Sequence, residues 1–332
     1  MHCELIVPGL FAGAGGARAA SAELLLARGR TASAESKSLE AWLQERFGLE
    51  GEPVAAGALT LAAAGGAPGE HCWARADPVH LRLMRDRLIV VPSAAFALSR
   101  EEADTLVESL NRHFIDRLSL QALEPERWCA RLERPFAFDA GPALDAAGRD
   151  VDLTLRIGGD AGRRWGTLLN EAQMLLHAHP VNLAREARGE ATVNSLWLWG
   201  VGAAPQVPPS RWQSVSANDP VALGLAQLAG SRGRALPASA EAWLERAPED
   251  GRHLLLLDAL RAPLALGHSA AYCECIEVLE ERWFAPLLAA LRGGRIGMVT
   301  VHVPDSLGAS FETIRGDLRR FWRRPKALEK YA

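Results

Sequence analysis

The most informative stretch of the chain is NEAQMLLHAHPVNLAREARGEATVNSLWLWGVG, residues 170–202. It places imidazole, amide and guanidinium groups within a few residues of two tryptophans. Buried polar side chains need hydrogen-bond partners, and the neighbouring sequence offers no obvious ones, so a ligand is one candidate partner. The alternative is that the same groups staple an inserted domain to the core of the protein, with Trp197 and Trp199 filling the core. The candidate ligand-binding residues are His179, Asn182, Arg185, Asn194 and Trp197.

The end of this stretch, residues 195–199, is typical of a buried strand, and similar apolar runs occur elsewhere. The other predicted buried strands cover residues 4–7, 253–258 and 296–302. Predicted helices cover residues 17–28, 38–47, 220–229, 239–245 and 271–291. Short apolar strands separated by helices indicate a mostly parallel sheet that is sandwiched by helices. The sequence therefore predicts an α/β core.

A different pattern fills the middle of the chain. Residues 51–71 are rich in Ala, Gly and Pro, and we interpret them as a connection with a short strand near Leu59. A helix is predicted over 99–114, with Ser99 as N-cap and Glu102 closing a capping box. Strands over 88–91 and 127–134 and an amphipathic helix over 162–177 complete an α+β pattern. We expect an inserted α+β domain at 69–190 and a core formed by 1–68 and 191–332.

Composition limits the partners and the compartment. The formal net charge of −3 over 332 residues gives no electrostatic case for nucleic acid or for an anionic membrane. The first residues lack the basic leading region of a signal peptide, so we expect a cytoplasmic protein. The basic end, residues 319–330, is predicted to be a docked helix rather than a nucleic-acid arm.

Cysteine and histidine spacing does not predict a zinc site. The five cysteines are an odd number, which favours reduced thiols. His268, Cys273 and Cys275 fit no finger or ribbon template. His177 and His179 lie at a predicted helix end before a proline, where their side chains are expected to diverge.

The block His179-Pro180-Val181-Asn182, followed by Arg185, Gly189, Asn194 and Trp197-Leu198-Trp199-Gly200, resembles the archaeal-type cofactor-independent phosphoglycerate mutases. These enzymes belong to the alkaline phosphatase superfamily. The resemblance implies an alkaline phosphatase-like core, two metal ions of the manganese or zinc class, and a serine that accepts the phosphoryl group. Metal coordination would activate that serine and balance the charge of the transferring group.

The whole chain is also similar to the RpfE-type regulatory proteins, a bacterial offshoot of the same group. The shared features are the opening Leu-Ile-Val-Pro-Gly-Leu, the run Asn-Glu-x-Gln-Met-Leu-Leu-His-x-His-Pro-Val-Asn and the ending Phe-Trp-Arg-Arg-Pro. This similarity spans nearly the full length, and it implies a regulatory role more than a mechanism.

Several catalytic positions that the resemblance implies hold unsuitable residues. The first strand of the family ends in Asp-Gly, where this chain has Pro8-Gly9. The nucleophile motif keeps Ser38, but its Asp and His are replaced by Leu39 and Trp42. Ser38 in this context is also a good helix N-cap.

The remaining ligand motifs are incomplete as well. His268 survives in Pro263–His268 while the Asp is Leu264, and Asp258 could replace it. The last Asp-His pair corresponds to Asp305-Ser306. Two divalent ions need many more anionic or imidazole ligands than these three groups. We therefore expect no metal cofactor.

These observations favour a catalytically degenerate, phosphoglycerate mutase-like protein. It would bind an anionic small molecule or a protein partner in the cleft between core and insertion, without being an enzyme. The alternative is an active metal-dependent phosphoglycerate mutase or phosphohydrolase, using Ser38 with Mn or Zn held by Asp258, His268 and Asp305. An assembly protein without any ligand is a third possibility.

Overall fold

The computed structural model describes residues 1–12, 16–33, 35–84, 87–133, 140–149, 159–248, 250–305 and 308–331. The chain divides into two compact units. The first comprises Met1–Glu50 and Val207–Ala332, and the second comprises Gly51–Gln206. Among the described residues, none of the helices combines the length and the apolarity needed to cross a membrane.

A seven-stranded sheet forms the centre of the first unit, with the order β2-β12-β11-β1-β10-β8-β9. The strands are β1 (His2–Ile6), β2 (Arg30–Ala32), β8 (Ser214–Ser216), β9 (Arg232–Arg234), β10 (Arg252–Leu256), β11 (Met298–Val303) and β12 (Ala309–Ile314). The pairs from β11 to β9 are parallel, whereas β12 and β2 run antiparallel at one edge. Their carboxyl ends therefore meet along one edge of the sheet.

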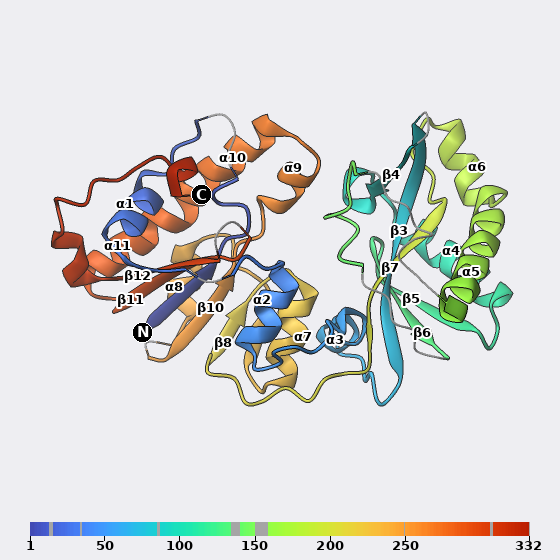
Figure 1. Cartoon of the computed structure of the whole chain (residues 1–332), viewed down its shortest axis with the longest axis horizontal. Coiled ribbons are helices and arrows are strands. Elements are labelled where there is room, and N and C mark those ends of the chain that lie inside the picture. Colours follow the sequence, from blue (N-terminus) through green and yellow to red (C-terminus); the bar gives the residue numbers. More distant parts are fainter. Residues whose placement is uncertain are drawn as a thin grey trace. The chain divides into compact units, whose positions relative to one another are not determined.

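Alternation along the strands gives this sheet one apolar face. Cys3, Leu5 and Val7 of the first strand lie in the main core with the corresponding residues of β10 and β11. Five helical segments cover this face: α1 (Ala20–Arg28), α8 (Ala240–Arg246), α10 (Ser269–Leu279), the π-helical η2 (Glu280–Phe284) and α11 (Ala285–Gly293). Figure 1 shows α1, α10 and α11 side by side over the strands.

The opposite face of the same sheet is more polar. Glu4 and His302 lie on it, because they alternate with the apolar positions of β1 and β11. The helix α2 (Leu39–Arg46) lies on this side, since the Trp42 ring packs 4.9 Å from the His302 ring. The helix α7 (Pro220–Leu228) contacts α2, β8 and β9.

The second unit contains a five-stranded sheet with the order β4-β3-β6-β5, in which β7 also pairs with β3. All pairings are antiparallel. The strands are β3 (Cys72–Met84), β4 (Arg87–Pro92), β5 (Leu118–Glu124), β6 (Arg127–Leu132) and β7 (Ser195–Gly202). The helices are α3 (Ala56–Ala63), α4 (Arg100–His113), α5 (Gly159–His177) and α6 (Pro180–Ala187). The helix α3 covers one face of the sheet, and α4 and α5 cover the other (Figure 1).

The predicted fold class is confirmed: the first unit has a mostly parallel sheet between helices, and the second is α+β. Two local predictions are also confirmed in detail. Ser99 caps α4, and its capping box with Glu102 is complete. Ser38 caps α2.

Other local predictions are wrong. Leu59 lies in the helix α3 rather than in a strand, and Gly57 lets that helix approach the backbone of Ala74 on β3. The strand predicted over 195–199 is β7, which joins the second sheet rather than the parallel one. Because α3 and β7 both pack within the second unit, that unit extends beyond the expected 69–190 to Gly51–Gln206.

The C-terminal segment differs from the predicted docked helix. It forms two short 3-10 turns, η3 (Arg315–Arg319) and η4 (Leu328–Tyr331). Leu328 is buried in the main core and anchors the segment, whereas Phe321 and Trp322 remain exposed.

Candidate functional site

The carboxyl end of β1 is the place where the resemblance puts the first metal ligand. The chain turns there at Pro8 and Gly9, and Gly9 has a left-handed φ of +82°. A Cβ added at Gly9 would lie 2.4 Å from Cδ1 of Leu264. Leu264 therefore lies beside the Pro8-Gly9 turn. The resemblance implies metal ligands at positions 8 and 264. The side chains found there, those of Pro8 and Leu264, cannot bind a cation.

The polar groups around this turn are engaged with each other. The Gly9 amide donates to Oδ2 of Asp305 at 2.7 Å. The Asp305 carbonyl accepts from Oγ of Ser36 at 2.6 Å. The Tyr272 hydroxyl donates to the carbonyls of Gly9 at 3.0 Å and Leu10 at 3.3 Å. Burial raises the pKa of Tyr272 to about 12, so the hydroxyl remains a donor at neutral pH.

Ser38 lies on the surface as the N-cap of α2. Its Oγ accepts a hydrogen bond from the amide of Ala41 at 3.2 Å. His268 is the residue before α10 and makes no capping bond with its side chain. Asp258 follows the end of β10 and is half-buried. Ser306 lies outside the described residues.

These groups do not fit a two-metal centre. Among the described residues, no group of three or more His, Cys, Asp or Glu side chains is arranged to hold a metal ion. The nearest candidate ligand to the β1 turn, Asp305, accepts a backbone hydrogen bond with one carboxylate oxygen. Leu264 fills the adjacent space. The residues at the end of β1 thus differ from the metal ligands that the resemblance implies there.

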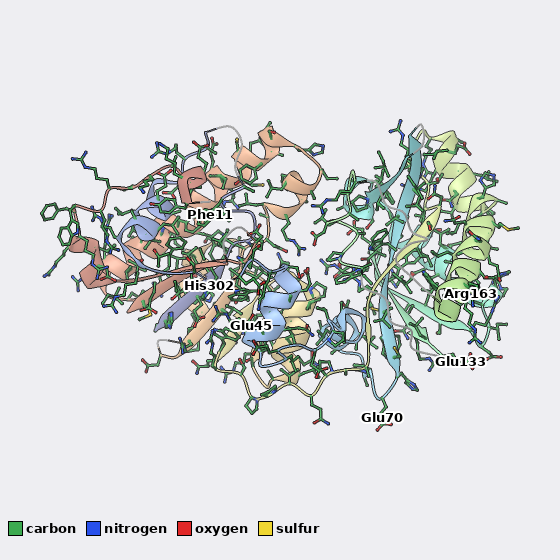
Figure 2. All side chains as sticks on the ribbon, viewed as in Figure 1. Phe11, Glu45, Glu70, Glu133, Arg163 and His302 are labelled. Carbon is green, nitrogen blue, oxygen red and sulfur yellow. The ribbon has the colours of Figure 1, made fainter. Side chains whose placement is uncertain are left out.

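A charged network lies on the polar face of the same sheet, centred on Glu4. The Glu4 carboxylate is 3.3 Å from Nε2 of His302, 3.3 Å from the guanidinium of Arg211 and 3.2 Å from Nε of Arg252. Glu4 itself is only 1% exposed. His302, labelled in Figure 2, lies over the strands beside α2.

Burial alone would raise the pKa of Glu4, but the hydrogen bond from His302 and the charge of Arg211 lower it to about 2. Burial also lowers the pKa of His302, although Glu4 opposes that effect. A neutral His302 satisfies both contacts by donating from Nε2 to Glu4 and accepting at Nδ1 from Ser310, which lies 2.7 Å away. The network therefore stabilises the sheet with an ionised carboxylate.

Arg185, the predicted anion-binding residue, is buried in the second unit. Its three nitrogen atoms donate to the Ala191 carbonyl, to Oε2 of Glu102 and to the Ala97 carbonyl, each at 2.7 Å. Its guanidinium also lies over the ring of Phe96, 5.7 Å from the ring centroid. Only 2% of Arg185 is exposed. The guanidinium thus joins α6 to α4 and to the segments on either side of them.

The other candidate ligand-binding residues are also bonded within the protein. His179 caps α6 and contacts Oγ of Ser109 at 2.9 Å. The amide of Asn182 donates to the carbonyls of residues 176 and 193 and accepts from the amide of residue 193. Asn194 pairs with both backbone groups of Leu81, and Trp197 donates to the Gly141 carbonyl. All of these contacts lie within the second unit, so they tie its own segments together and do not link it to the first unit.

A cavity of about 580 Å³ lies beside Arg185. Arg188 lines it and donates to Glu102 and Glu190, each at 2.8 Å. The two arginines and two glutamates on its wall balance in charge. The Arg185–Glu102 and Arg188–Glu190 pairings would have to break before either guanidinium could grip an anion, so this cavity is a weak anion site.

The sequence did not reveal the charge networks formed by two carboxylates, Glu102 and Glu4. Glu102 was identified as the closing residue of a capping box, but the same carboxylate also binds Arg185 and Arg188. Glu4 was placed correctly inside a buried strand, and a lone carboxylate in an apolar strand is itself a signal that a cation must lie nearby. Its partners come from residues 211, 252 and 302, and no local pattern predicts that meeting.

Comparisons with known proteins give a partial sequence match. No protein-family model matches the chain. The 2,3-bisphosphoglycerate-independent phosphoglycerate mutase of Methanosarcina barkeri is 37% identical over 121 residues, which cover 34% of this chain and 29% of that protein. The protein of the same name from Methanosarcina mazei is 38% identical over 65 residues, or 20% of this chain and 16% of that protein. The match thus spans less than a third of the length of these relatives.

Similarity in fold extends over more of the chain than similarity in sequence does. A solved structure of a protein from Pyrococcus horikoshii covers 94% of this chain, and 87% of that chain is matched, with a TM-score of 0.59 and 14% sequence identity. This likeness concerns the fold alone. Part of this chain is therefore homologous to the 2,3-bisphosphoglycerate-independent phosphoglycerate mutases, and the chain as a whole has an α/β architecture similar to that of the Pyrococcus horikoshii protein.

Proposed function

We propose that this protein is a catalytically degenerate relative of phosphoglycerate mutase with a binding or regulatory role. Its ligand would be an anionic small molecule or a protein partner. The regulatory role is the one implied by the resemblance to the RpfE-type proteins. All five cysteines are free thiols, which supports a reducing compartment such as the cytoplasm.

One observation carries the proposal: the apolar closure at the carboxyl end of β1. Leu264 packs against Gly9 where metal-dependent phosphoryl transfer would require carboxylates. A serine hydroxyl is a poor nucleophile without a cation or a base to activate it. Ser38 instead caps α2, where its oxygen accepts a hydrogen bond from the Ala41 amide.

The direct test is a phosphoglycerate mutase assay on the whole chain. The purified protein would be incubated with Mn²⁺ or Zn²⁺ and 3-phosphoglycerate, and the formation of 2-phosphoglycerate would be followed by ³¹P NMR. We expect no conversion above the protein-free control. Conversion that disappears in Ser38→Ala, with the fold intact by circular dichroism, would overturn the proposal and establish the active alternative.

A further inference from the structure

A second cavity lies in the first unit, between the end of α1, the edge strand β2 with its neighbour β12, and the C-terminal segment. Its volume is about 560 Å³, within the range of small-molecule pockets. Leu26, Phe311 and Tyr331 supply apolar surface, and Thr31 and Ser33 supply hydroxyls. None of these residues belongs to the motifs that resemble phosphoglycerate mutase.

The C-terminal wall of this cavity is held in place by several contacts. Tyr331 stacks on Phe11, with ring centroids 5.9 Å apart and planes 25° apart, and Phe11 is labelled in Figure 2. Arg323 donates to the Gly29 carbonyl at 2.6 Å, and Arg320 donates to the Arg28 carbonyl at 3.1 Å. The segment therefore forms a preorganised wall rather than a loose tail, which lowers the entropic cost of binding.

The wall is strongly cationic. Arg323, Arg324 and Lys326 line the cavity, and none of its described lining residues carries a carboxylate. In the described part of the chain, the side chains of Arg324 and Lys326 make no hydrogen bond or ion pair. This differs from the cavity beside Arg185, where each guanidinium already has an acidic partner. Two cations are thus available to an anion here.

An aromatic ring stands beside these cations. Trp322 lines the cavity, yet 66% of it is exposed to solvent. Its neighbour Phe321 meets it edge to face, with ring centroids 5.3 Å apart. An exposed indole next to unpaired cations is suited to stacking against a flat ring whose charged group reaches the cations.

We propose that this C-terminal cavity binds a small organic anion that carries a flat ring, of the nucleoside phosphate class. The phosphate lies against Arg324 and Lys326, and the ring stacks on Trp322. The volume accommodates one such molecule. The inference rests on the binding role proposed above, but its test measures ligand binding rather than catalysis, so a failure of the inference can be distinguished from a failure of the proposed function.

The experiment is isothermal titration calorimetry of the whole chain with adenosine monophosphate, adenosine and inorganic phosphate. We expect the monophosphate to bind more tightly than either of its parts. Binding should weaken about tenfold or more in Arg324→Ala/Lys326→Ala and in Trp322→Leu. The control, Arg319→Ala/Lys330→Ala, removes two exposed cations of the same segment outside the cavity and should leave binding unchanged.

Three results would overturn the inference. One is the absence of heat with adenosine monophosphate up to about 5 mM, which corresponds to negligible affinity. Another is equal weakening in the control variant, which would indicate nonspecific charge attraction. The last is tighter binding of an oligothymidylate with increasing length, which would assign the surface to single-stranded nucleic acid. Thermal melting of each variant checks that these exposed substitutions leave the fold intact.

Discussion

Replacing Arg185 with alanine should destabilise the second unit severely. The side chain is 2% exposed and makes three charge-assisted hydrogen bonds at 2.7 Å. Its removal leaves the carbonyls of Ala97 and Ala191 without that donor and deprives Glu102 of its buried partner. Unsatisfied buried groups cost about 1–3 kcal/mol each, and breaking a buried ion pair costs about 3–5 kcal/mol.

Arg188 still contacts Glu102 after the substitution, which reduces the penalty at that carboxylate. We therefore expect a loss of about 3–5 kcal/mol in the free energy of unfolding. For a unit of this size, that corresponds to a fall in melting temperature of roughly 10 °C. Arg185→Lys should recover only part of the loss, because an ammonium group cannot reach three divergent acceptors in one plane.

The assay is urea and thermal denaturation followed by circular dichroism. Arg112→Ala is the matched control on α4: its side chain is 71% exposed and, within the described part of the chain, pairs only with Glu108, so its loss should stay below about 0.5 kcal/mol. An Arg185→Ala protein that melts within about 2 °C of the wild type would refute the structural role. So would stabilisation of the wild type by 3-phosphoglycerate that vanishes in Arg185→Lys.

Three further substitutions test other parts of the structure. Ser38→Ala should lower the free energy of unfolding, measured by urea denaturation, by only about 1 kcal/mol, the usual value of a serine cap. Loss of cellular function in a Ser38→Ala variant that remains stably folded would show that the hydroxyl takes part in chemistry. Because the pKa of Glu4 is lowered from 4.5 to about 2, its contribution is present above pH 4.5 and disappears as the pH falls towards 2. The wild type should be more stable than Glu4→Gln by roughly 3 kcal/mol at pH 7, and urea denaturation should show this gap shrinking below about pH 4.5 and closing near pH 2; a constant gap would contradict the ionised network. Gly57→Ala would place a Cβ 2.4 Å from the Ala74 backbone and should cost about 3 kcal/mol or more, whereas Gly166→Ala on α5 meets no atom within 4 Å and should be neutral or stabilising; equal denaturation midpoints for the two variants would disprove the close approach.

A feature of the fold could be predicted from the sequence where the residues that form it lie close together along the chain. Ser38 and Ser99 were recognised as caps because the cap and its bonding partner lie within three residues of each other. The strand at 195–199 was found from its apolar run, but the run does not specify a partner. Its pairing with β3 involves residues more than a hundred positions away. The sequence therefore predicts the strand itself but not the sheet that it joins.

The same limit applies to the candidate site. The replacements at Pro8 and Leu264 could be read from the sequence, and each indicated a lost ligand. The sequence could not show that Leu264 packs beside the Pro8-Gly9 turn, because this contact depends on the path of residues 258–268 back to the end of β1. For Arg185, the sequence suggested an unpaired cation. The structure supplies Glu102, 83 residues away in the same unit, as its partner, which changes the interpretation from ligand binding to a structural contact within that unit.

The central claim is that the end of β1 is closed to metal ions by Leu264, Gly9 and the engaged Asp305. Elemental analysis of protein purified without chelator, and again after dialysis against Mn²⁺ or Zn²⁺, tests this claim most directly. We predict metal contents far below one equivalent per chain. Two equivalents of manganese or zinc per chain, retained through gel filtration, would contradict the account.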